Sequence, residues 1–489
     1  MPTDERHILS RSLRHRLDRI LGKGRLLTDA ASLLVYESDA LTHFHEPPLA
    51  VALPRTTEQV AETVRTLFEE KIPFTPRGAG TGLSGGALPP EGGGVLIDTC
   101  AMDGILEVLA DDRMARVQPG VVNLDLSLAV KEYGLMYAPD PSSQMACTLG
   151  GNVAENSSGP HSLLYGPTCA HVLGATVVME DGAILHLGGP HPAAPGPDLL
   201  GSFAGSEGTL GIVTELWVKL LPIPEAVATL LGSFADLPTA CRAVSRMIAE
   251  GVRASAIEAL DRLTIEAVES SVFAAGYPKD AGAVLLVELH GHPLDVEHDG
   301  DVVRRIFREG NALDIQQAED EEHRKRLWRG RKGAYGAMGR VAPDLYVMDT
   351  VVPRSKLEEA IRRITDICAR HGLRLANVFH AGEGNLHPNI SYDRRDTEEL
   401  TRVLAANGEI VEVCLELGGA LSGEHGIGIE KRAYMKLQFS DDDLAAFEDF
   451  RRAWSPELLL NPGKLLPTPR ACAAVKGRAA RIPDGEGAP

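Results

Sequence analysis

The sequence has no long apolar run. Its best candidate, Ala283–Leu289, has the length of a β-strand and contains Glu288, whereas a helix needs ~20 consecutive apolar residues to span a bilayer. The first residues, Met1–Arg19, are charged throughout and lack the apolar stretch of ~7–15 residues that marks a secretory signal. We therefore expect a soluble protein that resides in the cytoplasm.

Closely spaced cysteines are also missing. The seven cysteines lie far apart, at positions 100, 147, 169, 241, 368, 414 and 472, and no Cys-x-x-Cys motif occurs. A disulfide scaffold, a zinc ribbon and an iron–sulfur cluster all depend on paired or closely spaced cysteines. None of these three classes is therefore expected.

Positive charge is in short supply. The chain has 49 Lys and Arg against 68 Asp and Glu, which gives a formal net charge of −19. Nucleic-acid binding needs cations that displace the counterions of the phosphates, so nucleic acid is not an expected partner. At roughly 100–200 residues per domain, the length predicts two or three domains of ordinary size.

Glycine, in contrast, is abundant. The chain has 50 glycines among 489 residues, against a usual share of ~7%. Of these, 24 fall between Gly78 and Gly211. Turns or phosphate-binding loops in this stretch would explain the concentration.

The first half of the chain predicts a strand-rich α+β domain. Glu58–Lys71 has apolar residues at helical spacing and is followed by Pro73, so we expect a helix there. Short strands are expected at Val95–Asp98, Ala115–Val117, Val172–Met179, Ile184–Leu187 and Ile212–Leu221.

After the prolines of Pro222–Pro224, strands and helices alternate, which predicts a second, α/β domain. The expected elements are Val227–Phe234, Leu237–Ala249, Ala254–Ala259, Leu263–Phe273, Val284–Leu289, Val296–Arg308, Leu313–Ala318, Tyr346–Val352 and Ser355–His371. A third section, Leu375–Leu466, holds two clusters of glycine and histidine joined by the helix Glu398–Leu417. The tail from Thr468 has no periodic apolar face, so we expect it to be disordered.

Gly80–Gly85 matches the pattern G-x-G-x-x-G, but outside a Rossmann context. The Rossmann fingerprint follows a strand and opens a long helix. Here a helix is expected before the loop, and Ala87–Gly94, with two prolines and three glycines, leaves no room for a long helix after it. What remains is a run of backbone N–H groups suited to an anionic pyrophosphate. For this segment alone, an ordinary glycine loop is the alternative.

Two later segments have a similar character. Pro139–Gly159 and Gly205–Val213 combine glycine and proline with Ser, Thr and Asn. Prolines fix the path of the chain, glycines permit close approach, and the polar side chains supply neutral hydrogen-bond partners. Such a lining suits a bulky polar cofactor.

Histidines and carboxylates gather in the third section. His380 ends an apolar strand, a glycine-rich turn follows, and His387 lies on the returning strand, so a hairpin can bring both imidazoles together. Glu424 and His425 are consecutive and, if extended, point to opposite sides, so only one of them would ligate. Two His and one carboxylate typically hold Zn²⁺, Mn²⁺ or Fe²⁺ as a Lewis acid. The alternative is that these histidines are structural.

Several separate motifs resemble those of one protein family, and they follow one another in the same order as in that family. Arg77–Gly86, Pro139–Gly159 and Gly205–Val213 resemble the FAD-binding domain of the vanillyl-alcohol oxidase superfamily. Phe379–Pro388, Ser422–Gly428 and Asn461–Lys464 narrow the resemblance to the FAD-linked D-2-hydroxyacid dehydrogenases, most closely the catalytic subunits of glycolate oxidases. The resemblance extends from about Tyr36 to Pro467.

The resemblance implies an α+β fold. It consists of a two-part FAD-binding domain of vanillyl-alcohol oxidase (PCMH) type, a ferredoxin-like α/β cap domain and a C-terminal segment that closes the site. The expected boundaries are an N-terminal helical segment at 1–45, the FAD domain at 46–224, the cap at 225–420, the C-terminal segment at 421–467 and the tail at 468–489.

The resemblance also assigns cofactor-binding residues on these motifs. They are Arg77, Gly78, Gly80, Thr81, Gly82, Leu83, Ser84, Gly85, Pro139, Asp140, Ser142, Thr148, Gly150, Gly151, Asn152, Ala154, Asn156, Gly208, Gly211, Ile212, Val213 and Asn461. The resemblance implies that FAD is bound noncovalently, because the FAD-linked D-2-hydroxyacid dehydrogenases generally bind it without a covalent bond. His161 and Cys147 are the conceivable anchors if the flavin were covalently attached.

By the same resemblance, His380, His387 and Glu424 hold a divalent metal (Zn, Mn or Fe). The hypothesis is that the metal lowers the pKa of a 2-hydroxy acid's hydroxyl and that His425 takes its proton while the hydride passes to flavin N5. Arg331 matches the family's substrate arginine, whose fork can bind a carboxylate. Asn389, two residues after His387 and on the same strand face, is expected to contact substrate or metal.

The remaining expectations concern substrate and partners. Relatives that act on dicarboxylates have a lysine where this chain has Val347 and Met348, so a small monocarboxylate, glycolate or D-lactate, is favoured. Without an iron–sulfur motif of its own, the chain is expected to pass electrons to an iron–sulfur subunit and a second flavin-domain subunit, at the inner face of the cytoplasmic membrane. The alternatives are a D-lactate dehydrogenase working alone and a noncatalytic flavin-fold subunit.

Overall fold

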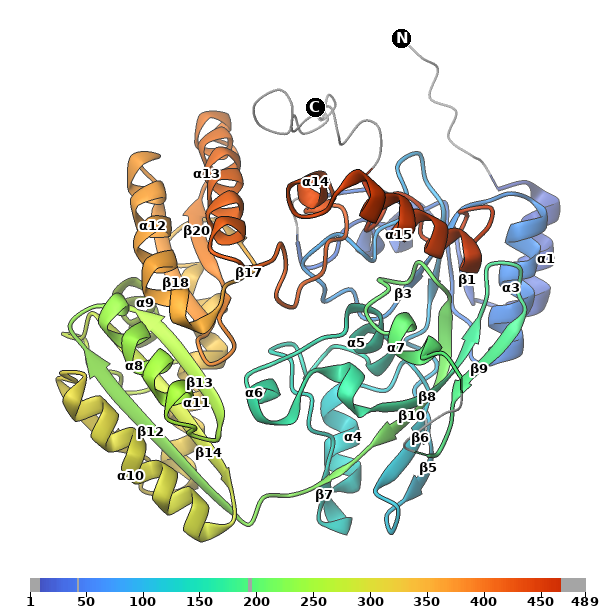
Figure 1. Cartoon of the computed structure of the whole chain (residues 1–489). Coiled ribbons are helices and arrows are strands. Elements are labelled where there is room, and N and C mark those ends of the chain that lie inside the picture. Colours follow the sequence, from blue (N-terminus) through green and yellow to red (C-terminus); the bar gives the residue numbers. More distant parts are fainter. Residues whose placement is uncertain (1–8, 42–43, 192–195, 468–489) are drawn as a thin grey trace. The chain divides into compact units, whose positions relative to one another are not determined.

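The computed structural model describes residues 9–41, 44–191 and 196–467. It divides into two units, each with its own core. In described residues, the first unit comprises 9–159, 165–223 and 424–467, and the second comprises 160–164 and 224–423 (Figure 1). The expected tail from Thr468 lies outside the described residues.

The first unit contains two larger sheets and a two-stranded one formed by β7 and β11. One has the strand order β1-β2-β4-β3, in which β2, β4 and β3 run parallel. The other is antiparallel, with the order β5-β6-β10-β8-β9. The bounds are β1 Leu26–Leu27, β2 Ala50–Ala52, β3 Phe74–Arg77, β4 Val95–Asp98, β5 Ile105–Leu109, β6 Met114–Val117, β7 Leu135–Met136, β8 Val172–Val178, β9 Ile184–Gly188, β10 Ile212–Lys219 and β11 Leu221–Pro222.

Helices complete the first unit. Helix α3, Thr57–Glu69, buries Val60, Val64 and Leu67, the spacing that predicted it, and α1, Arg11–Leu21, packs on α3. The others are α2 Ala30–Leu33, α4 Asn123–Val130, α5 Leu149–Glu155, α7 Leu199–Phe203, α14 Met435–Gln438 and α15 Asp441–Trp454. The short helix α6, Ser162–Tyr165, belongs to the second unit except for its last residue. Helix α5 is a correction, because its segment was expected to be a loop.

The context of the glycine-rich loop is partly as expected. No helix occurs between Gly78 and Gly94, so the Rossmann arrangement is absent from this described stretch. The expectation that a helix directly precedes the loop was wrong, however. Strand β3 lies between α3 and the loop and ends at Arg77. A four-residue strand that contains Pro76 is too short for its pattern to stand out in the sequence.

The second unit is built on one large sheet with the order β15-β12-β14-β13-β18-β19-β17, and β20 pairs with β18 and β16. Its bounds are β12 Ala226–Phe234, β13 Ala254–Asp261, β14 Ala283–Gly291, β15 Asp314–Gln317, β16 Asp344–Val347, β17 Thr350–Val351, β18 Arg374–His380, β19 Asn385–Leu386 and β20 Pro388–Tyr392. The first four strands have the order 4-1-3-2 of a ferredoxin-like βαββαβ motif, as expected.

Helices cover both faces of this sheet. Side chains from α8, α10, α12 and α13 share a core with Leu230, Leu285 and Phe379. Side chains from α9 and α11 share another with Leu231, Leu286 and Val378, because successive strand residues point to opposite faces. The bounds are α8 Leu237–Ala249, α9 Arg262–Glu269, α10 Pro293–Glu309, α11 Glu321–Met338, α12 Leu357–Arg370 and α13 Thr397–Glu416.

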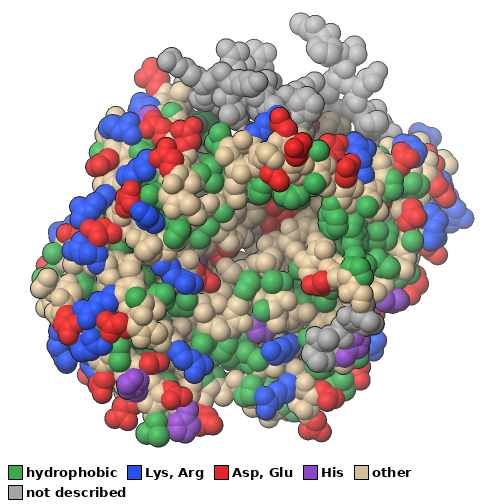
Figure 2. Space-filling model, in the orientation of Figure 1, with side chains coloured by type: hydrophobic (Ala, Val, Ile, Leu, Met, Phe, Trp, Pro, Cys, Tyr) green, Lys and Arg blue, Asp and Glu red, His purple; other side chains and the backbone are tan. Residues whose placement is uncertain are grey.

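Charge on the surface is mixed. On the face drawn in Figure 2, acidic and basic side chains are interspersed, so the acidic excess is not gathered in one place there. None of the six cysteines within the described residues forms a disulfide, in line with their spacing; Cys472 lies outside those residues. No helix in the described ranges has both the length and the apolar character needed to cross a membrane.

Candidate active site

The three glycine-bearing segments of the first unit meet one another. A Cβ on Gly78 would lie 2.4 Å from Thr148 Oγ1, so the first segment contacts the second directly. Gly208, in the third, packs on Pro76 at the start of the first. Residues that are far apart in the sequence therefore form one polar surface.

Asn461 holds this arrangement together. Its Nδ2 donates to the carbonyl oxygens of Gly86 and Glu207, at 3.2 and 2.7 Å, and its Oδ1 accepts from Thr75 at 3.0 Å. Arg77 acts in a similar way, because its guanidinium donates to Ser38 O at 2.9 Å and Ala87 O at 3.3 Å. Both residues were expected to bind the cofactor; the observed contacts show that they also fix the shape of the loops.

The other expected cofactor residues lie on these loops or beside them. Gly80 and Gly85 have positive φ, and the Gly85 N–H donates to Asp39 at 2.9 Å; Thr81, Gly82 and Leu83 are half-buried. Helix α5 carries Gly150, Gly151, Asn152 and Ala154, and Asn156 is its C-cap. Gly211 directly precedes β10, which begins with Ile212 and Val213. Pro139 accepts from Asn123, Asp140 is half-buried, and Ser142 is exposed.

Polar atoms on this surface fit a bound polar group. The hydroxyl oxygens of Ser84, Thr148 and Ser206 are buried and have no hydrogen-bond partner among the described residues. A buried hydroxyl that lacks a partner costs free energy, so a cofactor that supplies partners would stabilise the unit. Nothing lies within 4 Å of a Cβ built on Gly82, which leaves space beside the loop.

In the second unit, the expected hairpin forms and brings His380 and His387 together. Strands β18 and β19 pair antiparallel with His380 opposite Asn385. The two imidazole rings lie 5.4 Å apart in an edge-to-face arrangement, and a nitrogen of each lies within 4.8 Å of the other. Both side chains are buried.

Hydrogen bonds at Nδ1 orient both imidazoles. His380 Nδ1 lies 2.8 Å from Glu258 Oε1, and His387 Nδ1 lies 3.1 Å from the carbonyl oxygen of Met348. Because the Glu258 carboxylate and the Met348 carbonyl only accept hydrogen bonds, they favour the tautomer with the proton on Nδ1, in which Nε2 is the nitrogen able to ligate a metal. This is the usual outer-shell arrangement of metal-binding histidines, so these residues fit a divalent ion.

Glu258 also holds Arg331. The carboxylate Oε2 lies 2.6 Å from both Nε and Nη2 of Arg331, which is buried on α11. Burial raises the pKa of Glu258, but Arg331 and His380 outweigh it and hold the pKa below its usual value. The Nε edge of the guanidinium is thus already paired, so a substrate carboxylate would meet Nη1. Arg329 and Lys332 are exposed on the same helix.

Neither Glu258 nor Asp349 was expected at this site. A lone glutamate inside the apolar strand Ala254–Leu260 was the signal that could have found Glu258. Asp349 is buried and accepts from Ser422 Oγ at 2.5 Å and from the Gly423 N–H at 3.0 Å. One of its oxygens lies within 4.8 Å of a His387 ring nitrogen. It therefore ties the loop that precedes Glu424 to the hairpin.

The remaining predicted residues have defined surroundings. Asn389 is buried, and its Nδ2 donates to His387 O at 2.7 Å. Glu424 and His425 lie in the first unit, where Ser158 donates to Glu424 at 2.9 Å. Their chain makes bends, and His425 Nε2 lies 3.9 Å from Glu424 Oε1. The segment is therefore not extended, and the condition under which the two side chains were expected to point to opposite sides is not met.

Cys147 and His161, the two conceivable anchors for a covalent flavin, make other contacts in the structure. Cys147 is buried and its Sγ lies 3.7 Å from Asn152 Oδ1. Burial raises the pKa of its thiol, which disfavours the nucleophilic thiolate. His161 belongs to the second unit and pairs with Glu288 at 3.0 Å.

Comparison with known families defines the class of protein. An FAD binding domain model matches residues 48–188, and a model described as "FAD linked oxidases, C-terminal domain" matches residues 223–465. The fold is that of p-cresol methylhydroxylase, with a TM-score of 0.78 at 18% identity over 93% of this chain and 96% of that one. 4-Ethylphenol oxidase from Gulosibacter chungangensis is also similar, with a TM-score of 0.77 at 20% identity over 93% of this chain and 97% of that one. The PCMH-type α+β fold is thus confirmed.

Curated relatives narrow the class. The chain is 46% identical to the glycolate oxidase subunit GlcD of Escherichia coli K12 over 90% of this chain and 88% of that protein. It is 38% identical to GlcD of Bacillus subtilis 168, over 94% and 97%, and 33% identical to a D-lactate dehydrogenase of Anaerostipes hadrus, over 84% and 88%. The chain belongs to the FAD-linked oxidase family, in the branch that contains the GlcD subunits, and is an FAD-linked oxidoreductase.

Proposed function

We propose that this protein oxidises a small 2-hydroxy acid, glycolate in the first place, to the 2-oxo acid. The observation that supports it best is the hairpin that brings His380 and His387 together and connects them through Glu258 to Arg331. This is a paired set of metal-binding imidazoles with a carboxylate-binding guanidinium beside it. The relatives named glycolate oxidase subunit and D-lactate dehydrogenase point to the same substrate class.

The cofactor assignments form the first part of the proposal. FAD bound noncovalently to the expected FAD domain, 46–224, together with the C-terminal segment 421–467, would supply the hydride acceptor. Ser84, Thr148 and Ser206 would provide hydrogen-bond partners for it. His380, His387 and Glu424 would hold a divalent ion that polarises the substrate hydroxyl. Glu424 follows Gly423 directly, and the N–H of Gly423 is anchored on Asp349.

The substrate would be held by residues of the cap, 225–420. Arg331 binds its carboxylate through the edge of the guanidinium that Glu258 leaves, and Asn389 orients it beside His387. Val347 and Met348 are buried, so the segment where relatives acting on dicarboxylates have a lysine supplies no cation. A small monocarboxylate therefore fits better than a dicarboxylate.

His425 is proposed as the base. It takes the hydroxyl proton while the Cα hydride leaves, so that the 2-hydroxy acid loses two electrons and two hydrogens in one oxidation. Replacing His425 with Ala is expected to leave FAD bound and to slow flavin reduction by ~10²–10⁴-fold, the usual contribution of a general base. Stopped-flow absorbance under anaerobic conditions measures this; reduction at the wild-type rate would remove His425 from the role.

Anaerobic titration tests the function as a whole. The purified yellow protein is expected to lose its flavin absorbance when glycolate is added, and titration with D-lactate ranks the two substrates. If no small 2-hydroxy acid bleaches the flavin, the proposal is wrong and a noncatalytic flavin-fold subunit becomes the better description. If D-lactate reduces it faster than glycolate, a D-lactate dehydrogenase that works alone is favoured.

Electrons must leave the reduced flavin. No cysteine belongs to a possible metal-binding cluster in the part of the chain that the structure describes, and the family resemblance implies an iron–sulfur subunit and a second flavin-domain subunit as acceptors. We propose such a complex, in the cytoplasm at the inner face of the membrane. Co-purification of the tagged chain with an iron-containing protein from its own host would support it.

A further inference from the structure

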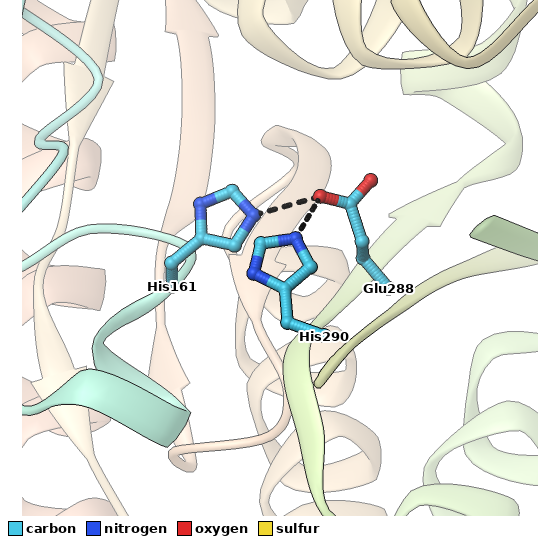
Figure 3. Close-up of side chains that lie close together, drawn as sticks. All are labelled: His161, Glu288 and His290. Carbon is cyan, nitrogen blue, oxygen red and sulfur yellow. Dashed lines mark hydrogen bonds and ion pairs between the residues drawn. The ribbon is translucent and has the colours of Figure 1, made fainter. Parts of the chain in front are cut away.

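A second cluster of histidine and carboxylate lies in the second unit, and none of the roles above uses it. His161 Nε2 is 3.0 Å from Glu288 Oε1, and His290 Nε2 is 2.9 Å from the same oxygen. The two rings are stacked, with centroids 5.0 Å apart and planes inclined by 16°. In Figure 3 both rings direct a nitrogen at one carboxylate oxygen.

The local structure explains why these three side chains meet. Glu288 and His290 are two residues apart on β14, so they point to the same face of the sheet. His161 comes from the short segment Pro160–Leu164, which belongs to this unit although its neighbours on both sides in the sequence belong to the first. Leu163 of that segment lies against Gly382, which fixes its path.

Neighbouring donors hold the carboxylate in one orientation. Thr229 Oγ1 and Trp328 Nε1 donate to Glu288 Oε2 at 2.7 and 2.5 Å. Because Oε2 is held in this way, Oε1 is the oxygen presented to the two imidazoles. Oriented carboxylates of this kind are typical of metal ligands, whose outer hydrogen bonds fix the atom that binds.

The distances fit an ion with bonds of ordinary length. For metal–ligand bonds of ~2.1 Å, nitrogen–oxygen separations of 2.9 and 3.0 Å correspond to angles of about 90° at a shared ion, and all three ligand atoms lie within 4.8 Å of one another. We propose that His161, Glu288 and His290 bind a divalent transition-metal ion of the class that imidazole favours, such as Zn²⁺.

Arg324 is the group that competes with such an ion. Its Nη1 lies 3.2 and 3.3 Å from the two oxygens of Glu288. The same guanidinium makes shorter bonds to Glu321, through Nε at 2.8 Å and Nη2 at 3.0 Å, which offset its charge. The alternative is an ion pair without metal, in which both imidazoles donate directly to Glu288.

The ion can reach this place and would have a structural role there. The side chains of His161 and His290 are 15% and 10% exposed, whereas Glu288 is fully buried. An ion would fasten the segment Pro160–Leu164 to β14, and through Trp328 it would also support α11. The site does not depend on the proposed substrate or on the metal proposed at His380 and His387.

Zinc binding by the flavin-loaded full chain tests the site. We would strip the protein with a chelator, titrate it with ZnCl₂ in a calorimeter and count the ions retained after gel filtration by mass spectrometry. The variants are H161N, H290N and H387N. H298N serves as the matched control, because His298 is an exposed histidine on α10 of the same unit. Flavin absorbance and circular dichroism verify that each variant is folded.

The expected result is the loss of one equivalent of Zn²⁺ in H161N and in H290N, with the wild-type stoichiometry in H298N. H387N should lose a different equivalent, and Co²⁺ added to H387N should still give the absorption of an imidazole-ligated ion. If H161N and H290N bind as much Zn²⁺ as H298N does, the cluster is a metal-free ion pair and the proposal is overturned. If H387N, like H298N, keeps the wild-type Zn²⁺ stoichiometry while H161N and H290N each lose one equivalent, the metal proposed at His387 fails and the one inferred here stands.

Discussion

Glu258 on β13 and Glu288 on β14 are both fully buried on the side of the sheet that α9 and α11 cover. Both also receive side chains from α11, Arg331 in one case and Arg324 with Trp328 in the other. Their histidines differ. His380 offers Nδ1 to Glu258, whereas His161 and His290 both offer Nε2 to Glu288.

This difference separates two uses of the same residue types. Around Glu258, the carboxylate accepts from Nδ1 of His380, which suits the metal-binding role proposed for Nε2, and it holds Arg331 in the position proposed for substrate binding. Around Glu288, the carboxylate oxygen converges with the imidazole nitrogens themselves, which is the arrangement of a closed, structural site. Which ring nitrogen meets the carboxylate thus distinguishes the two clusters, although each contains two histidines and a glutamate.

Histidine removal should produce the largest contrast. His387→Ala is expected to slow anaerobic flavin reduction by about 10²–10⁴-fold, because a metal that polarises the substrate is worth several kcal/mol. His290→Ala should slow it by less than about tenfold, since a structural ion acts on stability. Stopped-flow reduction of both variants measures this. Equal effects would erase the functional distinction between the two clusters.

Loss of the Glu258 charge should destabilise the protein strongly. Glu258→Gln leaves Arg331 buried beside a neutral amide, and removing one partner of a buried pair costs ~3–5 kcal/mol. Since the proton acceptor of His380 is also weakened, metal affinity should fall by ~10–100-fold. Urea unfolding and calorimetry with ZnCl₂ measure the two effects.

The matched control is Glu297→Gln, an exposed glutamate on α10 of the same unit. Its free energy of unfolding should stay within about 0.5 kcal/mol of the wild-type value. A Glu258→Gln protein as stable as this control, with unchanged metal affinity, would show that Glu258 positions neither Arg331 nor His380.

The smallest expected effect is on the pH dependence of stability. It should distinguish Glu258 and Glu288 in the second unit from Asp39 in the first unit. Attractive partners hold the pKa values of Glu258 and Glu288 below their usual range although burial raises them, so their contribution is present above about pH 4.5 and is lost as the pH falls further. Burial raises the pKa of Asp39 to about 6, so its contribution is present below pH 3.8 and is lost as the pH rises through 6.

Unfolding measured between pH 4 and 7 tests these signs. Relative to wild type, Asp39→Asn should gain stability as the pH rises, on the order of 2 kcal/mol for a shift of about two pKa units. The cost of Glu258→Gln should instead shrink as the medium becomes acidic. A pH-independent difference for Asp39→Asn would mean that its carboxylate titrates normally in the folded protein.

Much of the fold followed from local patterns. Strands β8 and β9, β12 to β14, and helices α3, α8 and α12 agree with their expected ranges to within a few residues, because apolar periodicity and turn residues act over short distances. The expectation failed at short elements. Strand β3 has four residues, and α5 contains two glycines, so both lack a periodic signal strong enough to read.

The candidate site divides in the same way. The hairpin with His380 and His387 could be predicted because a turn joins its strands directly. Glu258 could not be assigned, because it is 122 residues from His380 in the sequence and meets it only through the pairing of β13 with β18. The roles of Arg77 and Asn461 in fixing the loops depend likewise on distant carbonyl groups.

The sequence by itself determined the class of protein: the glycine-bearing segments, the histidine hairpin and the order of the motifs all depend on residues that are close together in the chain. Only the tertiary structure decided which buried carboxylates contact the functional side chains. Glu258 contacts His380 and Arg331, and Glu288 contacts His161 and His290. The physical reason is that a buried charge must find its partners in space. Sheet pairing, rather than proximity along the chain, brings those partners together.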